Sequence, residues 1–515
     1  MDSESSAMVD GTFGDVRSVV QRGVASERAW VDLLGLMERL GEVEGALDYV
    51  VDHVEREWPA ALRRAPRRWV EGFVKGEPVA LAPLAKVLEL GRYEDEYAWY
   101  WSAEEVRLDA YVEPLGDDML SELLADEGWS NLSGLSVRAQ EMGPKSIGVL
   151  ACAPHLCAVT SLDVRGNFNN GELFGALVDG MFPVEQLEEL GIEGDVVRSE
   201  ARRFMDPGVT GGVRTLRLMD ATLFDERALD GVPLGGALGG VRVLDLSQSY
   251  LEDAELEVML ERFEWPELRS LNLSQTSLTD EMWGRIAQVP WAERLEAVDL
   301  SSNDRISPRT VQLFERGALR AVRSLNLGGT EVGMDSVWSL LESGSLEGLE
   351  HLDITALEST SPLNWFELDA RAPLVSMSVG FDEEWEAVVH WLKAPFFSTL
   401  RQLELGGTFR SPTSAMGRLF DHAWCVPRLE HLGLAASGVT DADIEGMCMG
   451  FARPGLRTLD LRANEITDDG ARVLAGCAAL AGLEVLDLRY NRGLTGRGRQ
   501  VLYDSAVWSG CALRT

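Results

Sequence analysis

A regular spacing of apolar residues recurs along most of the chain. From Leu456 to Asn464, apolar residues stand at positions one, four and six, and an asparagine stands at position nine. In a short strand, the side chains at positions four and six would point to one face, which would be buried. Those at positions three and five would point to the opposite face. The pattern begins at fourteen places, 25 to 29 residues apart: Leu132, Val159, Leu187, Val213, Val241, Leu268, Leu295, Val322, Leu349, Leu374, Leu400, Leu429, Leu456 and Leu483. Such a period indicates an array of similar units.

Each unit also predicts a helix after its strand. Between Leu256 and Phe263, apolar residues lie at i, i+3, i+4 and i+7, behind Asp253 as a candidate N-cap. Thr467 is the corresponding candidate in the unit that starts at Leu456. A strand of three or four residues cannot bury its leucines alone, so neighbouring units must stack to form one core.

With these residues the sequence resembles the leucine-rich repeat family. Its period of about 27 residues, with a helix in every repeat, is similar to the ribonuclease-inhibitor-like branch. The resemblance covers about Leu132 to Thr515, and the last five residues start one further unit. It implies an α/β solenoid: a horseshoe in which a parallel sheet lines the concave side and helices cover the outside. A fold of this kind leaves the function open.

Position nine is expected to bond the backbone of neighbouring turns. Hydroxyl, amide and carboxylate side chains can do so, but Ala221 and Leu357 cannot, which predicts looser turns in those two units.

The first part of the chain reads as a helical capping domain. Residues 1–104 contain apolar residues at helical spacing from Trp30 to Leu40, and Pro78–Leu90 is interpreted as part of the same helical region. Val106–Ala110 resembles a degenerate first strand, because it lies one period before the first complete unit. We therefore expect a capping domain over 1–104 and a repeat domain of about fourteen complete repeats over 105–515, with degenerate terminal units.

Charge and cysteine content narrow the function classes. Asp and Glu number 84 against 47 Lys and Arg, a formal net charge of −37, so nucleic acid is not an expected partner. Neither a leader nor a membrane-spanning run is apparent, which predicts a cytoplasmic protein that does not bind membranes. The six cysteines show no CxxC spacing, and we interpret them as buried thiols. The oligomeric state is left open.

Searches for catalytic chemistry give no candidate. The chain lacks the GxxxxGK[ST], HExxH and GxSxG patterns, and the glycine-rich stretch at Gly231–Gly240 reads as a turn. His351 and His431 are three repeats apart, too far to share a metal. The sequence therefore predicts a protein without catalytic residues, metal or cofactor.

The surface of the sheet is the candidate site. Position five carries a series of acids, with Asn272 and Asn326 interleaved so that neighbouring carboxylates stay apart: Asp163, Asp245, Asp299, Asp353, Glu404, Asp460 and Asp487. Position two mixes arginines with glutamates, which predicts partial neutralisation along one rim. A purely structural role for the acids is the favoured alternative. The expected partner-binding residues are His351, Asp353, Phe381, Gln402, Glu404, His431, Asp460, Asp487 and Tyr490.

Two other groups are better explained as structural. Trp365, Trp385 and Trp391 are expected to fill the core behind shortened repeats. The basic stretch Leu62–Trp69 is expected to be a solvated helix face, with an anion site as its alternative.

The sequence thus predicts a non-enzymatic scaffold that binds a protein partner, expected to be basic, on an acidic concave face. One alternative is a regulator of an enzyme, either an inhibitor of a basic nuclease or a GTPase activator. A second is catalysis by the N-terminal domain, which lacks paired catalytic groups.

Overall fold

The computed structural model describes most of the chain. The described residues are 16–20, 25, 27–40, 46–77, 79–90, 114–167, 175–176, 184–193, 198–219, 229–230, 238–249, 251, 253–316, 319–357, 372–380, 398–406, 428–450, 455–508 and 511–515. They fall into two compact units. Unit 1 comprises Met1–Tyr93, Tyr111–Arg242 and Arg262–Glu267, and unit 2 comprises Glu94–Ala110, Val243–Glu261 and Leu268–Thr515.

Unit 1 begins with helices and continues as stacked strands. Its first elements are α2 (Glu27–Leu40), α3 (Ala46–Glu57), η1 (Ala60–Leu62), α4 (Arg67–Val74) and η2 (Ala82–Leu84). The apolar stripe of α2 is buried from Trp30 to Leu40. Later helical segments are α5 (Gly116–Ala125), η3 (Glu127–Trp129), α6 (Pro144–Cys152), η4 (Pro154–Leu156), η5 (Val184–Gln186), α8 (Arg198–Phe204) and α9 (Pro207–Thr210).

The helical interpretation of Pro78–Leu90 is wrong at its C-terminal end. Val87–Leu90 forms strand β1, which pairs in parallel with β2 (Gly134–Val137). Leu88 and Leu90 are buried and Glu89 between them is exposed, which is the period of a strand. The first strand therefore lies within residues 1–104, whereas Val106–Ala110 and the 104/105 boundary lie outside the described residues.

The described strands number sixteen and follow one another in chain order. Unit 1 continues from β1 and β2 with β3 (Ser161–Asp163), β4 (Glu189–Glu193) and β5 (Thr215–Met219). Unit 2 contains β6 (Val243–Asp245), β7 (Ser270–Asn272), β8 (Ala297–Asp299), β9 (Ser324–Asn326), β10 (His351–Thr355), β11 (Ser376–Gly380), β12 (Gln402–Glu404), β13 (His431–Gly433), β14 (Thr458–Asp460), β15 (Val485–Asp487) and β16 (Ala512–Arg514). Neighbouring strands within each unit pair in parallel, and β16 confirms the further unit expected at the last five residues.

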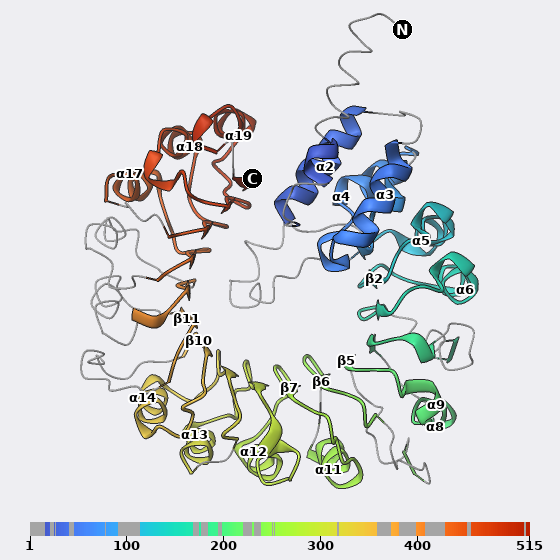
Figure 1. The fold of residues 1–515 in the computed structure, drawn as a ribbon. Helices are drawn as coiled ribbons and strands as arrows, with labels where there is room; N and C mark the ends of the chain where they lie inside the picture. The colour runs from blue at the N-terminus through green and yellow to red at the C-terminus, as the bar shows by residue number, and fades with distance from the viewer. Residues whose placement is uncertain are drawn as a thin grey trace, which may run out of the picture. The chain divides into compact units, whose positions relative to one another are not determined.

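Helices cover one face of the unit 2 sheet. From β6 onward they are α11 (Asp253–Arg262), α12 (Asp280–Ile286), η7 (Ala292–Arg294), α13 (Pro308–Glu315), α14 (Met334–Ser343), α17 (Asp441–Gly450), α18 (Asp468–Ala475), η10 (Ala478–Leu480), α19 (Gly496–Tyr503) and η11 (Ala506–Trp508). Figure 1 shows α12, α13, α14, α17 and α18 on the same side of the strands. Among the described residues the other side carries no helix, and we call it the helix-free face.

The core lies between the strands and the helices. Positions one, four and six of the repeats are buried, as at Leu456, Leu459 and Leu461, where exposure is at most 3 %. Each of these leucines packs within a layer continued by the next repeat, which confirms an α/β solenoid of the leucine-rich repeat type.

Buried asparagines at position nine join neighbouring repeats. Oδ1 of Asn303 accepts the backbone N–H groups of Thr276 (3.0 Å) and Leu278 (2.9 Å), and its Nδ2 donates to the carbonyls of Leu273 and Leu300. Asn167, Asn464 and Asn491 also bond the backbone of the preceding repeat. The expected role of position nine is thus confirmed at these repeats. Leu357 occupies the position as a buried apolar residue, and Ala221 lies outside the described residues.

A second ladder joins the N-termini of helices. Asp280, the first residue of α12, accepts the N–H and the hydroxyl of Ser307, the N-cap of α13, and the hydroxyl of Thr310. Asp441 bonds Thr467 in the same way, and Thr467 is the N-cap of α18 as expected. These bonds satisfy donors at the start of one helix with a carboxylate from the helix before it.

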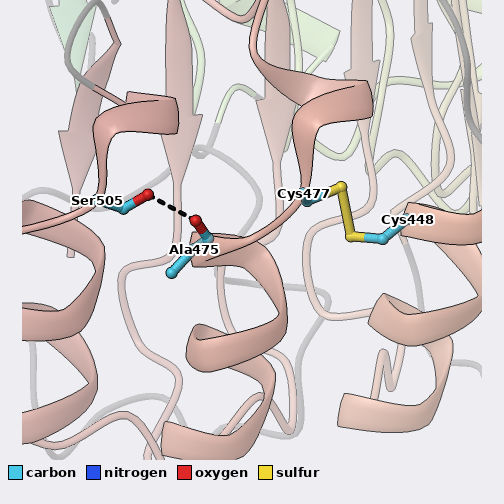
Figure 2. The surroundings of a disulfide bond; sticks show 4 residues. All are labelled: Cys448, Ala475, Cys477 and Ser505. Carbon is cyan, nitrogen blue, oxygen red and sulfur yellow. Dashed lines mark hydrogen bonds between the residues drawn. A yellow bond between two sulfur atoms is a disulfide. The ribbon is translucent and has the colours of Figure 1, made fainter.

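The expectation of buried free thiols is wrong. Cys448 of α17 and Cys477, just after α18, form a disulfide with Cα atoms 5.5 Å apart (Figure 2), while Cys152 and Cys157 are exposed. The pair is 29 residues apart, about one repeat, so stacking brings the two cysteines together. A search for short CxxC spacings misses such a pair.

Three arginines of the basic stretch Leu62–Trp69 form ion pairs with glutamates. Arg63 is 1 % exposed and bonds Glu55 and the carbonyl of Leu84, Arg64 pairs with Glu89, and Arg68 pairs with Glu38. Its arginines therefore hold the first helices to one another and to β1. A fully solvated helix face does not describe it.

No helix in the described part of the chain combines the length and apolar character needed to cross a membrane.

Removing one asparagine of the ladder should destabilise the array. Asn303→Ala leaves the two buried N–H groups without their side-chain acceptor and removes a donor from two carbonyls, which should lower the free energy of unfolding by about 2 to 4 kcal/mol. Urea unfolding followed by circular dichroism measures this. Gln500→Ala, on the exposed surface of α19, is the control and should change the midpoint little. Equal midpoints for the two variants would contradict the role of the ladder.

The helix-cap ladder predicts an acid-sensitive contribution to stability. Burial raises the pKa of Asp280, but the bonds from Ser307 and Thr310 outweigh it and hold the pKa below the ordinary value of 3.8. The stabilisation is therefore present above that value and is lost as the pH falls through the lower folded-state pKa. Asp280→Asn should lower the thermal midpoint at pH 7 and flatten its decline between pH 4 and 2. Asp304→Asn, at an exposed site, should leave both unchanged.

Candidate functional site

Position five forms a continuous row across the helix-free face of unit 2. The strand register places these residues side by side from β6 to β16: Asp245, Asn272, Asp299, Asn326, Asp353, Ser378, Glu404, Gly433, Asp460, Asp487 and Arg514. We call this the central row. From Asp245 to Asp460, an acid alternates with a neutral residue, so neighbouring carboxylates lie about 10 Å apart instead of about 5 Å. The alternation expected at the two asparagines continues through Ser378 and Gly433.

Most acids of the central row also close the turn that follows their strand. Oδ1 of Asp299 accepts the N–H of Ser301 at 2.9 Å, and Oδ1 of Asp353 accepts that of Thr355 at 2.9 Å. Asp245, Asp460 and Asp487 make the same bond to the residue two positions later. The structural role weighed for these acids is therefore confirmed. The second carboxylate oxygen of Asp299 accepts a hydrogen bond from Nδ2 of Asn326, and those of Asp460 and Asp487 accept hydrogen bonds from arginine groups.

Partial burial makes the middle carboxylates costly to ionise. Burial raises the pKa of Asp299 above its ordinary value despite bonds from Ser301 and from Nδ2 of Asn326. Burial likewise raises the pKa of Asp353, and the negative charge of Glu404 two strands away adds to the effect. An approaching cationic group would relieve both, because it favours the charged form of each carboxyl.

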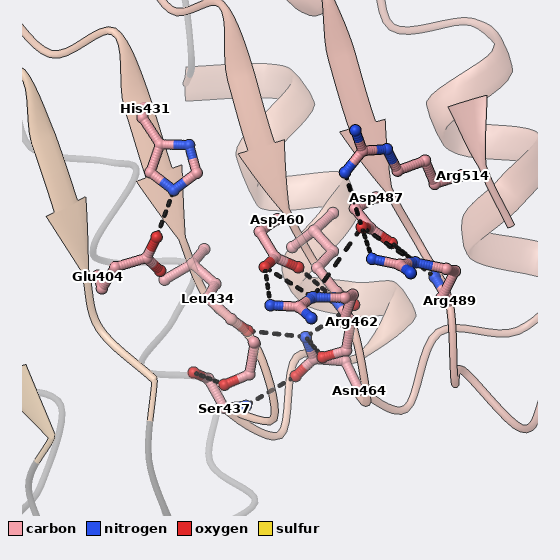
Figure 3. Close-up of polar contacts among 12 residues, drawn as sticks. Glu404, His431, Leu434, Ser437, Asp460, Arg462, Asn464, Asp487, Arg489 and Arg514 are labelled. Atoms are coloured by element: carbon pink, nitrogen blue, oxygen red, sulfur yellow. Dashed lines mark hydrogen bonds and ion pairs between the residues drawn. The ribbon is translucent and has the colours of Figure 1, made fainter. Parts of the chain in front are cut away.

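A histidine and a glutamate pair on neighbouring strands. Nε2 of His431 contacts Oε1 of Glu404 (Figure 3), and 37 % of the Glu404 side chain is exposed. Burial lowers the pKa of His431, but the hydrogen bond and charge of Glu404, with a contribution from Asp460, outweigh this and raise it. The pair is therefore held as an imidazolium against a carboxylate over a wider pH range than for an isolated histidine.

Asp460 and Asp487 stand on neighbouring strands with no neutral residue between them, and arginines offset the two negative charges. Arg462 pairs with Asp460 at 2.8 Å, Arg489 pairs with Asp487 at 2.7 Å, and Arg514 approaches Asp487 to 3.9 Å (Figure 3). Both aspartates are buried, with residue exposures of 7 % and 4 %. This differs from the expected acidic surface, because the groups that reach solvent here are guanidinium groups.

One rim of the helix-free face is neutralised in pairs. Arginines at position two bond the glutamate at position two of the next repeat in Arg323–Glu350, Arg401–Glu430 and Arg457–Glu484. The partial neutralisation expected along this rim is confirmed at these positions. Such exposed pairs contribute little to stability, but they cancel charge beside the central row.

Eight of the nine expected partner-binding residues lie on or just after consecutive strands from β10 to β15. His351, Gln402 and His431 stand at position three of their repeats, as the first residues of β10, β12 and β13. Strand pairing places them in one row, with Ser376 of β11 between His351 and Gln402. His351 and Gln402 are exposed. Phe381 lies outside the described residues, as do Trp365, Trp385 and Trp391.

The guanidinium groups were missed by sequence reasoning. Arg462 and Arg489 stand at position seven, two residues after an aspartate, and Arg514 stands at position five of the last strand. Arg165 makes the same contact with Asp163 in unit 1, where burial raises the pKa of that carboxyl but the Arg165 contacts outweigh it. An arginine two positions after an aspartate at position five is a signal that could have identified the pairs.

Tyr490 occupies an unusual backbone position for an aromatic residue. It follows β15 at position eight, has φ of 64°, and is 37 % exposed. Other described repeats place a small or polar residue with positive φ there: Ala139, Gln248, Gln275, Ser302, Ala356, Ala436 and Ala463. A bulky side chain in this left-handed region costs of the order of 1 kcal/mol. Cζ of Arg489 lies 5.9 Å from the Tyr490 ring centroid, so the ring and the guanidinium form one surface.

Among the described residues, no group of three or more His, Cys, Asp or Glu side chains could hold a metal ion.

Comparison with known proteins supports the repeat. A family model described as "Leucine Rich repeat" matches residues 456–475. No curated protein matches the sequence. The chain therefore contains leucine-rich repeats, and with the sheet described above it is a solenoid of that type.

Similar solved structures include an internalin (inlF) from Listeria monocytogenes str. 4b F2365, at 14 % identity and a TM-score of 0.31, covering 77 % of this chain and 92 % of that chain. The Rad7 and Elc1 complex in yeast is 15 % identical with a TM-score of 0.38, covering 78 % and 83 %. The TLR13–ssRNA13 complex is 14 % identical with a TM-score of 0.36, covering 73 % and 64 %. At these values the similarity says nothing about partner or activity.

The His431–Glu404 pair predicts a measurable titration. In protein with isotope-labelled histidine, NMR should find a His431 pKa above 6.5, and Glu404→Gln should lower it because the carboxylate charge is removed. The same shift fixes how the pair affects stability. Its contribution to the free energy of unfolding is complete below the unfolded-state pKa of His431 and is lost as the pH rises through the folded-state pKa. The remaining histidine signals serve as internal controls. A His431 signal that titrates identically in both proteins would contradict the pair.

Proposed function

We propose that this protein is a non-enzymatic scaffold that binds a basic protein partner on the helix-free face of unit 2. The observation that carries the proposal is the spacing of carboxylates along β8 to β12. Asp299, Asp353 and Glu404 stand on alternate strands, with neutral residues between them. Cationic side chains of a partner could each meet one carboxylate without bringing two carboxylates together.

The cost of ionising partly buried carboxyl groups makes the β8–β12 part of the face selective for cations. The pKa of Asp299 and Asp353 is raised chiefly by burial, so their charged forms gain from an opposite charge nearby. Glu404 is the more exposed anchor, and His351 and Gln402 supply polar contacts beside it. The net charge of −37 would steer a basic partner from a distance.

The size and rigidity of the face suit a protein ligand. Eleven strands at about 4.8 Å spacing give a row about 50 Å long. A standard interface needs about 800 Å² per partner, which such a row can supply. Each strand is fixed by its neighbours, so binding would order few groups and lose little conformational entropy. Residues 1–104 remain, in this proposal, a helical cap that includes the first strand of the sheet.

Neutralising two central carboxylates should weaken partner capture. Immobilised wild-type protein is compared with the Asp353→Asn, Glu404→Gln double variant for capture from a lysate of the source cells. We expect the main captured protein to be basic, to be lost at high salt, and to bind the double variant about fivefold less tightly, because two charge contacts are removed.

The matched control is the Glu342→Gln, Glu445→Gln double variant, which removes two exposed charges from α14 and α17. It should capture the partner as the wild type does. Equal capture by both double variants would overturn the carboxylate site. Nuclease-inhibition and GTP-hydrolysis assays on the captured partner distinguish a simple scaffold from a regulator of an enzyme.

A further inference from the structure

Three guanidinium groups converge at the β14–β16 end of the helix-free face. Around the carboxylate of Asp487, Arg489 approaches to 2.7 Å, Arg514 to 3.9 Å and Arg462 to 4.0 Å. Arg462 also holds Asp460. Three guanidinium groups therefore surround two carboxylates in this cluster.

The exposed part of the cluster is its positive part. The side chains of Asp460 and Asp487 are 10 % and 6 % exposed, whereas those of Arg489 and Arg514 are 33 % and 38 % exposed. A ligand approaching this end meets guanidinium nitrogens, which the carboxylates beneath hold in fixed positions. Fixed guanidinium groups lose less side-chain entropy when they bind an anion.

Arg489 keeps one donor edge available. It uses Nε and Nη2 to bond both oxygens of Asp487. Within the described part of the chain, its Nη1 has no hydrogen-bond acceptor. The hydrogen bond and charge of Asp487 also raise the pKa of Arg489, so it stays protonated. A carboxylate of a ligand would fit this free edge, since guanidinium and carboxylate groups match in geometry.

Tyr490 adds an apolar and hydrogen-bonding contact beside the guanidinium groups. Its ring is exposed next to Arg489 at a backbone position where the other described repeats carry smaller or polar residues. Aromatic and arginine side chains together are the residues most enriched among those that dominate binding energy at protein interfaces.

The local charge is opposite to that of the whole chain. Residues 488–515 contain five arginines and one acidic residue, Asp504, in a protein with a net charge of −37. Two of these arginines, Arg497 and Arg499, belong to α19 on the helix-covered side, whereas Arg489 and Arg514 follow or lie on strands. A long polyanion such as RNA would be repelled by the remaining surface. A short peptide segment with a few carboxylates would meet only the basic end. The charge pattern thus favours a protein segment over nucleic acid.

We propose that Arg462, Arg489, Arg514 and Tyr490 form a second docking surface, which takes an acidic segment of a protein partner. This inference extends the scaffold function proposed above, and it gives the middle and the β14–β16 end of the helix-free face of unit 2 opposite charge preferences. A partner carrying a basic stretch and an acidic stretch would therefore bind in one direction along the sheet.

Fluorescence anisotropy with two labelled peptides, hexaglutamate and hexalysine, tests the two sites separately at low salt. We expect the Arg489→Gln, Arg514→Gln variant to bind hexaglutamate about tenfold less tightly, with hexalysine binding no weaker. The Asp353→Asn, Glu404→Gln variant should bind hexalysine less tightly, with hexaglutamate binding no weaker. The matched control, Arg309→Gln with Arg472→Gln, removes two exposed arginines from α13 and α18 and should bind hexaglutamate as the wild type does.

Tyr490→Ala keeps every charge and should still weaken hexaglutamate binding about twofold, which tests the surface without exposing Asp487. Circular dichroism verifies that each variant is folded. The proposal is overturned if wild-type protein does not bind hexaglutamate, if the control variant loses binding equally, or if a hexauridylate RNA binds at least as tightly. If wild-type protein binds hexaglutamate but not hexalysine, the carboxylate site is overturned and the basic docking surface is supported.

Discussion

Parallel pairing between very short strands is the constraint on which the structure depends. Strands of three to five residues bury at most two apolar side chains each and cannot persist alone, so every repeat takes its stability from the repeats beside it. The buried asparagines make this dependence specific. Asn303 satisfies backbone groups of its own repeat and of the one before, which fixes the register of the two turns. Aspartates such as Asp280 make a second series of bonds between repeats, at the N-termini of neighbouring helices.

The same spacing determines where charge can be placed on the helix-free face. Side chains at position five of neighbouring strands are about 5 Å apart, too close for two uncompensated carboxylates. The chain meets this limit in two ways. Along β6 to β13, neutral residues such as Asn326 and Gly433 separate the acids. At β14 and β15, Asp460 and Asp487 are adjacent, and arginines neutralise them. The resulting face carries carboxylates in its middle and guanidinium groups at one end.

Much of this fold follows from the order of residues because the repeat is periodic. The leucines at positions one, four and six predict the strands from β2 onward, and asparagine at position nine predicts the bonds between turns. Features that depend on contacts between repeats were harder to predict from the sequence. Cys448 and Cys477 are close only because two repeats stack, and no short motif marks them. Val87–Leu90 was misassigned because four residues after a proline-containing apolar run give too little period to separate strand from helix. For the site, position alone placed Asp460 and Asp487 on the correct face but could not show that arginines cover them.

The cross-link between α17 and the segment after α18 affects how the array can come apart. A stack held by nearest-neighbour contacts can lose its terminal modules one at a time, since each has a partner on one side only. Cys448 and Cys477 tie two successive modules covalently, so the module of β14 cannot separate from that of β13 even when its contacts open. Opening that spreads from β16 toward β13 would therefore stop at β14 in the oxidised chain. Reduction would let the opening continue inward, whereas the guanidinium cluster, which needs β15 and β16, would lose its shape in either redox state.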